Sequence, residues 1–362
     1  MNATANDIPR DTLHGDDPGT PRADFAPAHR THVFAQLLKR EFWEHKGGFF
    51  WAPMVAGGIF LLLALMGIGI GEVTRQRLAD HPVQIDGRSG LTLGNLNLGD
   101  VTRELSGKDL KELGQVVDVS LFMANSWPLI VLAFVVFFYC LGALYDERKD
   151  RSVLFWKSLP VSDRDTVLSK VVSAAVVAPL LAAAAGLITM FGFLLVTSAV
   201  VLVHGGNPVT LLWGPGNPLA IAAKLVGALP VYAVWALPTI GWLLLCSAWA
   251  RSKPFLWAVM IPLFAAIFVS WFDLMALFDL DSAWFWKHVF ARSLFSTVPG
   301  SDLFFRGDLS DMSVDGADDF QRLLSLRVAY GAFLRPDIWV GAAAGIAMIV
   351  AAIRLRRWRD EG

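Results

Sequence analysis

The sequence predicts an all-α polytopic membrane protein with six transmembrane helices, an N-terminal amphipathic interfacial helix and two extracytoplasmic segments. Composition is the first reason: 55% of the 362 residues are hydrophobic and only 17% are charged, with a mean hydropathy of +0.50. The second reason is that apolar residues gather in six blocks, and most of these reach the roughly 20 residues that a helix needs to cross a bilayer. The 14 Trp also suit the interfacial belts of a membrane protein.

The chain begins with two polar regions of different character. Residues 1–27 contain Pro, Gly and Asp but no apolar core of a signal peptide, so we expect a disordered cytoplasmic tail. Residues 28–48 have apolar side chains at helical spacing, which predicts an amphipathic helix on the cytoplasmic membrane surface, in contact with lipid. Packing of its apolar stripe against the protein is an alternative that is compatible with this. The predicted surface residues are Phe34, Leu37, Leu38, Lys39, Arg40 and Phe42.

The six apolar blocks all fall within residues 49–357, which we expect to form the membrane domain. They cover approximately 49–71, 126–145, 169–203, 218–250, 254–272 and 338–353. The third and fourth blocks exceed the length of one crossing, which indicates tilt or extension past the bilayer rather than additional spans. Pro179, Pro230 and Pro238 lie inside these two blocks, where we expect the helices to bend.

The distribution of Lys and Arg predicts the orientation. Six basic residues lie in 146–170, two in 251–253 and four after residue 353, whereas the loop 204–217 has none. With six spans, all the basic segments lie on one face, and the positive-inside rule makes that face cytoplasmic. Both termini are then cytoplasmic, including the short tail 358–362, in a protein of the plasma membrane, the inner membrane in a bacterium.

Two long segments are then extracytoplasmic, at about 72–122 and 273–336. Neither contains an apolar run of spanning length. The second includes the aromatic stretch 283–290, which suits either a helix in the membrane interface or part of a small folded loop domain.

The sequence contains no recognisable catalytic, metal or nucleotide motif. HExxH, a GxxxxGK[ST] phosphate loop and a CxxC pair are all absent. A formal net charge of −1 argues against nucleic acid as a partner. The spans contain almost no ionisable side chains and no carboxylate near mid-membrane, with Lys224 as the exception, which argues against a carrier driven by an ion gradient. We therefore expect no catalytic residue, no metal and no cofactor on this chain.

The most specific polar feature lies at 145–162. Dense mixed charge is followed directly by Val-Leu-Phe-Trp, and Pro160 then ends a short helix. Ser162 with Asp165 resembles a capping box that opens the next helix. Aromatic side chains within a charged rim are typical of a protein-binding surface. A solvated positive-inside loop is the alternative.

This region resembles the segment between the second and third spans of type-2 ABC exporter permeases. The similarity rests on three stretches, Leu144–Arg148, Ser152–Ser162 and Val167–Lys170, and on the overall layout. It implies a coupling helix that contacts a separate P-loop ATPase subunit, a pair of permease chains, and outward transport without enzyme activity on this chain. The long 72–122 insertion departs from the smallest family members. The implied coupling residues are Glu147, Arg148, Arg151, Phe155, Trp156, Leu159, Pro160, Ser162 and Lys170.

Two other functions also fit the sequence. A membrane anchor or assembly protein would bind a cytoplasmic partner through the same segment and transport nothing. A lipid-modifying enzyme would need polar groups near a membrane face, for which the candidates are Asp273, Asp279, Asp281 and His288. For the permease, a homodimer is the simplest assembly, although a heterodimer would leave the same sequence. The dry spans favour a lipophilic or amphipathic cargo.

Overall fold

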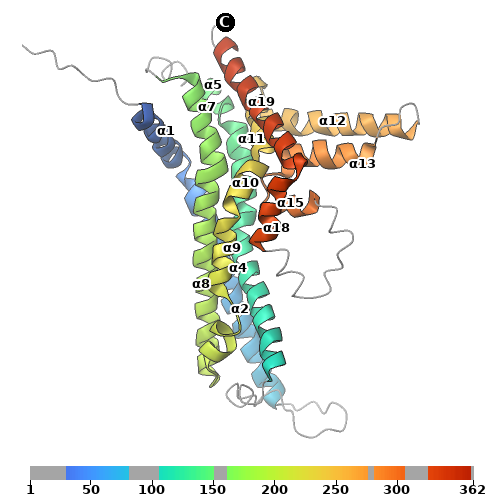
Figure 1. Ribbon diagram of the computed structural model, residues 1–362. Helices are drawn as coiled ribbons and strands as arrows, with labels where there is room; N and C mark the ends of the chain where they lie inside the picture. Colours follow the sequence, from blue (N-terminus) through green and yellow to red (C-terminus); the bar gives the residue numbers. More distant parts are fainter. Residues whose placement is uncertain (1–29, 81–105, 151–160, 276–280, 306–324, 360–362) are drawn as a thin grey trace, which may run out of the picture.

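The computed structural model of the chain is all-helical throughout the residues that it describes (Figure 1). The described residues are 30–80, 106–150, 161–275, 281–305 and 325–359. The predicted tail 1–27 lies outside them, as do parts of the predicted segments 72–122 and 273–336.

Within these residues, six helices are long and apolar enough to cross a membrane. They cover Gly47–Arg77, Gly107–Lys149, Asp163–Val203, Pro218–Trp235, Pro254–Leu274 and Pro336–Trp358. The length and composition of these helices make the chain a multi-pass membrane protein. The predicted all-α fold with six helices of spanning character is confirmed.

The first half of the chain supplies α1 and three long helices. Its elements are α1 (Arg30–Glu44), η1 (Gly47–Trp51), α2 (Ala52–Asp80), α4 (Gly107–Gly142), α5 (Tyr145–Lys149), α7 (Asp163–Val172), η3 (Ser173–Val177) and α8 (Ala178–Val203). The second half is more broken. Its elements are η4 (Val209–Trp213), α9 (Pro218–Gly227), α10 (Leu229–Trp235), α11 (Leu237–Trp249), α12 (Pro254–Leu274), α13 (Ser282–Phe285), η5 (Trp286–Ala291), α14 (Arg292–Phe295), α15 (Ser301–Phe305), α18 (Leu326–Gly331), η6 (Ala332–Leu334) and α19 (Pro336–Arg359).

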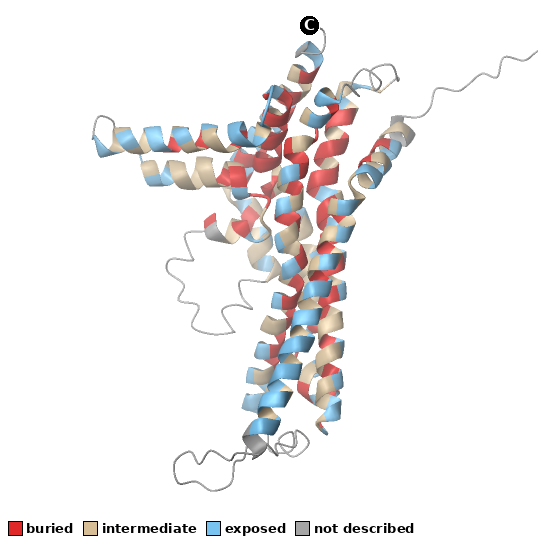
Figure 2. Cartoon of the chain, turned by 180° about the vertical axis from the view of Figure 1, so that it is seen from behind, coloured by how far each residue is buried: buried red, intermediate tan, exposed pale blue. Residues whose placement is uncertain are grey.

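The long helices form a bundle in which α4 packs against α2, α8 and α11, while α19 packs against α11. Its main hydrophobic core includes Leu132, Val136, Ile240 and Leu243, each almost completely buried. Figure 2 shows that buried residues are most frequent toward the end of the bundle that carries the C-terminus. The start of α7 and the short helix α5 lie at this same end (Figure 1).

The proline residues predicted to bend the long blocks lie where the helices are interrupted. Pro230 and Pro238 each occupy the second residue of a new helix, so the fourth block is divided into α9, α10 and α11. Proline has no amide hydrogen to bond the carbonyl four residues earlier, which explains both breaks. Pro179 is the second residue of α8, which follows η3, a π-helical turn between α7 and α8.

One helix start differs from the sequence prediction. We expected the second apolar block to begin near residue 126, but α4 starts at Gly107. Its additional turns are amphipathic, with Val117 and Leu121 buried and Lys108 exposed. The Ser106 hydroxyl accepts from the backbone N–H of Asp109, whose carboxylate accepts from the backbone N–H of Ser106. This capping box gives the helix a defined start outside the apolar run.

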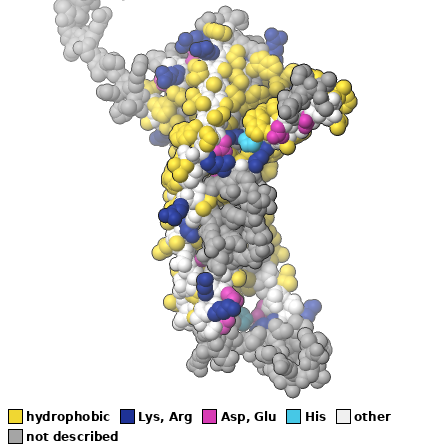
Figure 3. All heavy atoms as spheres, turned by 45° about the vertical axis from the view of Figure 1, so that its right-hand side comes forward, with side chains coloured by type: hydrophobic (Ala, Val, Ile, Leu, Met, Phe, Trp, Pro, Cys, Tyr) yellow, Lys and Arg dark blue, Asp and Glu magenta, His cyan; other side chains and the backbone are white. Residues whose placement is uncertain are grey.

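The fifth apolar block is a helix of spanning length, but its axis does not run parallel to those of the other long helices. Figure 1 shows α12 running across the long axis of the other helices, with α13 returning beside it. The Trp286 indole nitrogen donates to Ser270 Oγ at 2.8 Å, which fastens the returning segment to α12. The outer surface of α12 is apolar and exposed, and hydrophobic side chains cover much of this face of the molecule (Figure 3).

The contact between α11 and α19 depends on two glycines. A Cβ atom at Gly241 would clash with the backbone of Gly345, and a Cβ atom at Gly345 would clash with the carbonyl of Leu237. Small residues allow this close backbone approach between helices. We expect Gly241→Ala to destabilise the protein by about 1–3 kcal/mol through overpacking. Reversible unfolding in mixed micelles measures this, with Gly58→Ala as the control because no atom lies within 4 Å of that Cβ position. Equal stability of the two variants would contradict the close approach.

Candidate functional site

Six charged side chains meet at the end of the bundle that carries the C-terminus. We call this set the charge cluster. Its members are Arg40, Glu41, Glu147, Asp163, Lys170 and Arg356. Three are acidic and three are basic, so their formal charges balance. They come from α1, α5, α7 and α19, which are far apart in the sequence.

Lys170 lies at the centre of the charge cluster. Its ammonium nitrogen is 2.9 Å from a carboxylate oxygen of Glu41 and 2.9 Å from one of Glu147. Lys170 and Glu41 are each only 1% exposed. The second carboxylate oxygen of Glu41 accepts a 2.8 Å hydrogen bond from the Tyr139 hydroxyl. Both oxygens of Glu41 are therefore satisfied although the residue is buried.

Glu147 connects the rest of the charge cluster. Its other carboxylate oxygen is 2.7 Å from Arg356 Nη1, and Arg356 Nε donates to Asp163 at 3.1 Å. Arg40 also approaches Glu147, at 3.4 Å. Removing charges from water is costly, and this cost is offset only where each charge has close partners of opposite sign. The close pairing within the cluster therefore favours one relative placement of α1, α5, α7 and α19.

A second set of contacts fixes α5 against the end of α11. The Ser247 hydroxyl accepts from the backbone N–H groups of Leu144 and Tyr145, at 3.0 and 2.9 Å. In return, the Arg148 guanidinium donates to the carbonyls of Ser247 and Ala250, the latter at 3.0 Å. The start of α5 and the C-terminal carbonyls of α11 therefore satisfy each other through one side chain from each helix. We call these four hydrogen bonds the α5–α11 clamp.

The structure brings together part of the predicted coupling set. Glu147 and Lys170 are direct partners in the charge cluster, and Arg148 belongs to the α5–α11 clamp. Ser162 Oγ accepts from the Asp165 N–H at 3.0 Å, which confirms that Ser162 caps α7. The remaining predicted residues lie outside the described residues; they are Arg151, Phe155, Trp156, Leu159 and Pro160.

The predicted surface residues of α1 divide between two environments. Leu37 is buried and Arg40 pairs with Glu147, so this face packs on the protein itself. Lys39 is exposed. The three other residues are partly buried, namely Phe34, Leu38 and Phe42. The packing alternative for this helix therefore holds for its Leu37 face.

Sequence reasoning missed several residues of this site. Glu41 was not singled out, although it lies one helical turn after Leu37 and so on the apolar face of α1. A carboxylate on an apolar helix face indicates a buried cation as its partner. This pattern could have identified Glu41 from the sequence. Tyr139, Asp163 and Arg356 have no comparable local signal, because their partners are distant in the sequence.

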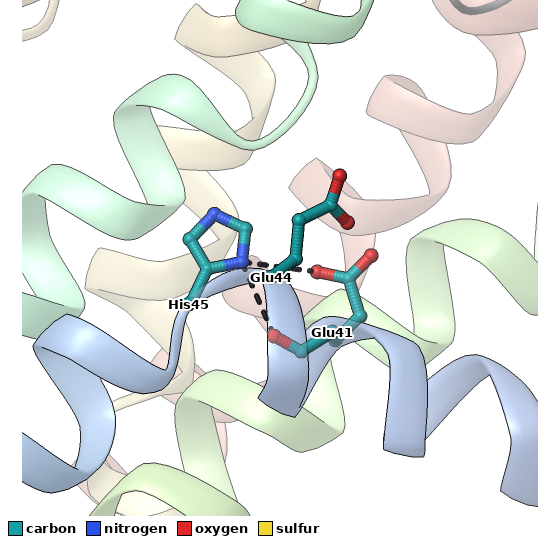
Figure 4. Close-up of side chains that lie close together, drawn as sticks. All are labelled: Glu41, Glu44 and His45. Carbon is teal, nitrogen blue, oxygen red and sulfur yellow. Dashed lines mark hydrogen bonds and ion pairs between the residues drawn. The ribbon is translucent and has the colours of Figure 1, made fainter.

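One group of potential metal-binding side chains lies within the described residues. Donor atoms of Glu41, Glu44 and His45 lie within 4.8 Å of one another (Figure 4). The Glu41 carboxylate is already bound by Lys170 and Tyr139. His45 Nδ1 lies 3.2 Å from the Glu41 backbone carbonyl, and Glu44 pairs with Arg40 at 3.2 Å. These contacts explain the group without a metal ion.

Two of the residues considered for a lipid-modifying enzyme, Asp281 and His288, have local contacts. Asp281 Oδ1 accepts from the Trp284 N–H at 2.8 Å and thereby caps α13. The His288 ring stacks on Trp284 with 5.0 Å between centroids. Asp279 lies outside the described residues. Asp281 and His288 therefore have local roles in helix structure, and Asp273 lies in the last turn of α12 (Pro254–Leu274).

A smaller polar contact joins α2 and α8 at the opposite end of the bundle. His204 Nε2 lies 3.0 Å from Glu72, and His204 Nδ1 lies 2.8 Å from the Val200 carbonyl. The Val200 carbonyl and then the Glu72 carboxylate raise the pKa of His204 above its ordinary value of about 6.5.

This contact predicts a pH dependence of stability. Because protonated His204 is favoured in the folded state, its contribution should be complete below about pH 6.5 and should fall as the pH rises through the raised pKa. We expect thermal unfolding to show this decline in the wild type and to lose it in His204→Gln. The same pH profile in both proteins would contradict the assignment.

Comparison with family models, with curated proteins and with solved structures finds no match for this chain. The function is therefore argued from the arrangement of its own residues.

Proposed function

We propose that this chain is the membrane-spanning permease subunit of an ABC exporter, driven by a separate P-loop ATPase subunit that docks on the 146–170 segment. The observation that supports this most strongly is the fixed position of α5. This five-residue helix lies at the start of the segment and is held by both the charge cluster and the α5–α11 clamp. A helix this short is unstable alone, so these contacts provide its stability.

The contacts of α5 provide a mechanical route from the cytoplasm into the bundle. Glu147 links α5 to α7 through Lys170 and to α19 through Arg356. Arg148 and Ser247 link α5 to α11. Lys170 also links α7 to α1 through Glu41. A partner that displaces α5 would therefore displace four further helices, which fits rigid-body rocking between two forms.

The polar residues within the spans fit an external energy source better than an ion gradient. Asp118 is a buried carboxylate in α4, but its Oδ1 accepts from the Asn217 N–H at 2.8 Å. This bond ties α4 to the start of α9 and gives Asp118 a structural role. The buried charges of the charge cluster are paired with one another, so the cluster offers no open binding site for a coupling ion.

The proposed assembly is a pair of permease chains with two ATPase subunits in the plasma membrane, the inner membrane in a bacterium. Both termini and the charge cluster would face the cytoplasm, and 72–122 and 273–336 would contain the extracytoplasmic parts. The α1 helix would lie at the cytoplasmic membrane surface. The uncovered apolar surface of α12 requires hydrocarbon or a second chain, which fits a dimer in a bilayer.

Two substitutions test the coupling role. We expect Glu147→Ala and Leu159→Asp to abolish ATP-driven movement while leaving membrane insertion intact. Spin labels at Arg77 and Leu202, near the far ends of α2 and α8, would report the movement in nanodiscs that contain the ATPase. Nucleotide-dependent distances in the wild type, absent from both variants, would support coupling. Unchanged movement in both variants would contradict it, and stable ATPase binding without movement in the wild type would favour the anchor alternative.

A further inference from the structure

A cavity of about 280 Å³ lies along the middle of α4. Its walls come from α4, α8, α9, α10 and α18, together with the segment 298–303. Most of the lining is apolar and includes Phe122, Leu129, Ile221 and Leu229. Both the size and this lining suit the apolar body of a small ligand, for which pockets of roughly 300 Å³ and above are typical.

Most of the hydrogen-bonding groups around the cavity are already engaged. The Tyr232 hydroxyl donates to the Thr297 carbonyl at 3.0 Å. The Trp235 indole nitrogen donates to Ser301 Oγ at 3.0 Å, and the Ser126 hydroxyl donates to the Met123 carbonyl at 2.7 Å. These side chains shape the wall, and their donor hydrogens are not available to a ligand.

Among the uncharged polar side chains of the lining, Asn125 is the exception. It lines the cavity and is 1% exposed, yet neither its amide nitrogen nor its amide oxygen has a hydrogen-bond partner among the described residues. The side chain packs against Gly186 of α8, where a Cβ atom would collide with its oxygen. A glycine on the facing helix therefore makes room for a buried amide whose two polar atoms are unsatisfied. Buried polar groups in proteins are rarely left in this state.

The charged groups of the lining indicate the character of a matching ligand. Lys224 and Asp302 both line the cavity and carry opposite charges, so the wall has no net charge. A neutral polar group therefore fits better than an ion. Because Asn125 offers one acceptor and one donor side by side, its natural complement is another group with a donor and an acceptor, such as an amide.

We propose that this cavity binds an apolar molecule that carries an amide group, with the apolar body against the lining and the amide paired with Asn125. The amide bond of a hydrophobic peptide or of an acyl amide has this chemistry. That the bound molecule is transported rests on the proposed function. That the cavity binds it does not depend on an ATPase.

The test compares two probes of equal length on the purified chain in lipid nanodiscs, without ATPase. The probes are N-decylacetamide and decyl ethyl ether, and binding to empty nanodiscs is subtracted. We expect the wild type to bind the amide at least tenfold more tightly, because a site with a buried polar group rejects an analogue that leaves it unpaired. Equal binding of the two probes by the wild type would overturn the proposal and indicate that water satisfies Asn125.

Two variants test whether Asn125 is the residue responsible for the preference for the amide probe. Asn125→Leu should bind the ether as the wild type does and lose the preference for the amide. Met123→Leu is the matched control, because Met123 is 60% exposed on the same helix and should retain the preference. Retention of the amide preference by Asn125→Leu would also overturn the proposal. Because no ATPase is present in this assay, a negative result would overturn the binding proposal without affecting the coupling proposal.

Discussion

Lys170→Met should destabilise the protein by about 3–5 kcal/mol, because it leaves the carboxylates of Glu41 and Glu147 buried without their shared cation. Methionine approximates the length and apolar stem of lysine, so the change removes the charge and leaves the packing largely intact. Reversible unfolding in mixed detergent micelles measures the difference in free energy.

The matched control for this change is Lys108→Met. Lys108 pairs with Glu112 at 3.8 Å, but its side chain is 84% exposed. An exposed pair of this kind contributes little, about 0–1 kcal/mol. A similar loss of stability in the two variants would show that buried Lys170 contributes no more to the free energy of unfolding than exposed Lys108. The charge cluster would then not stabilise this end of the bundle.

Arg148→Met should release α5 from α11. The variant loses the hydrogen bonds from the guanidinium to the carbonyls of Ser247 and Ala250. Hydrogen bonds to charged groups contribute about 1.5–3 kcal/mol, which corresponds to a factor of roughly 10–100 in a local opening equilibrium. We therefore expect amide hydrogen exchange in residues 145–149 to accelerate by at least tenfold.

Lys149→Met is the control for the clamp. It removes the same charge from the neighbouring residue of α5, and Lys149 is exposed. Exchange in α5 should stay close to that of the wild type in this variant. If Arg148→Met and Lys149→Met exchange alike, the α5–α11 clamp does not hold α5, and the mechanical route to α11 is wrong.

The sequence was sufficient to predict the six long apolar helices, although not the start of α4, because the signals of an apolar run are local. Apolar runs of spanning length, the capping residue Ser162 and the interrupting Pro230 and Pro238 each act within a few residues of themselves. The direction of α12 was not predictable in this way. Its composition identifies a long apolar helix, but composition contains no information about the angle at which a helix meets its neighbours.

The site was only partly predictable for the same reason. Glu147, Arg148 and Lys170 were identified by resemblance and lie in the predicted segment. Glu41 lies 129 residues from its partner Lys170, and Ser247 lies 99 residues from its partner Arg148. Asn125 looks like an ordinary polar residue at the start of an apolar block, and only the packed structure shows that its amide is buried and unpaired.

The most direct test of the proposed function is affinity purification of the tagged chain from native membranes in mild detergent, followed by mass spectrometry. We expect a P-loop ATPase to be recovered at close to one copy per chain, and to be lost when residues 147–160 are scrambled. Because scrambling also disturbs Glu147 and Arg148, Leu159→Asp provides the narrower variant and should lose the ATPase as well. Recovery of the chain without any ATPase would contradict the permease proposal and leave the 146–170 segment as a positively charged connection between two spans.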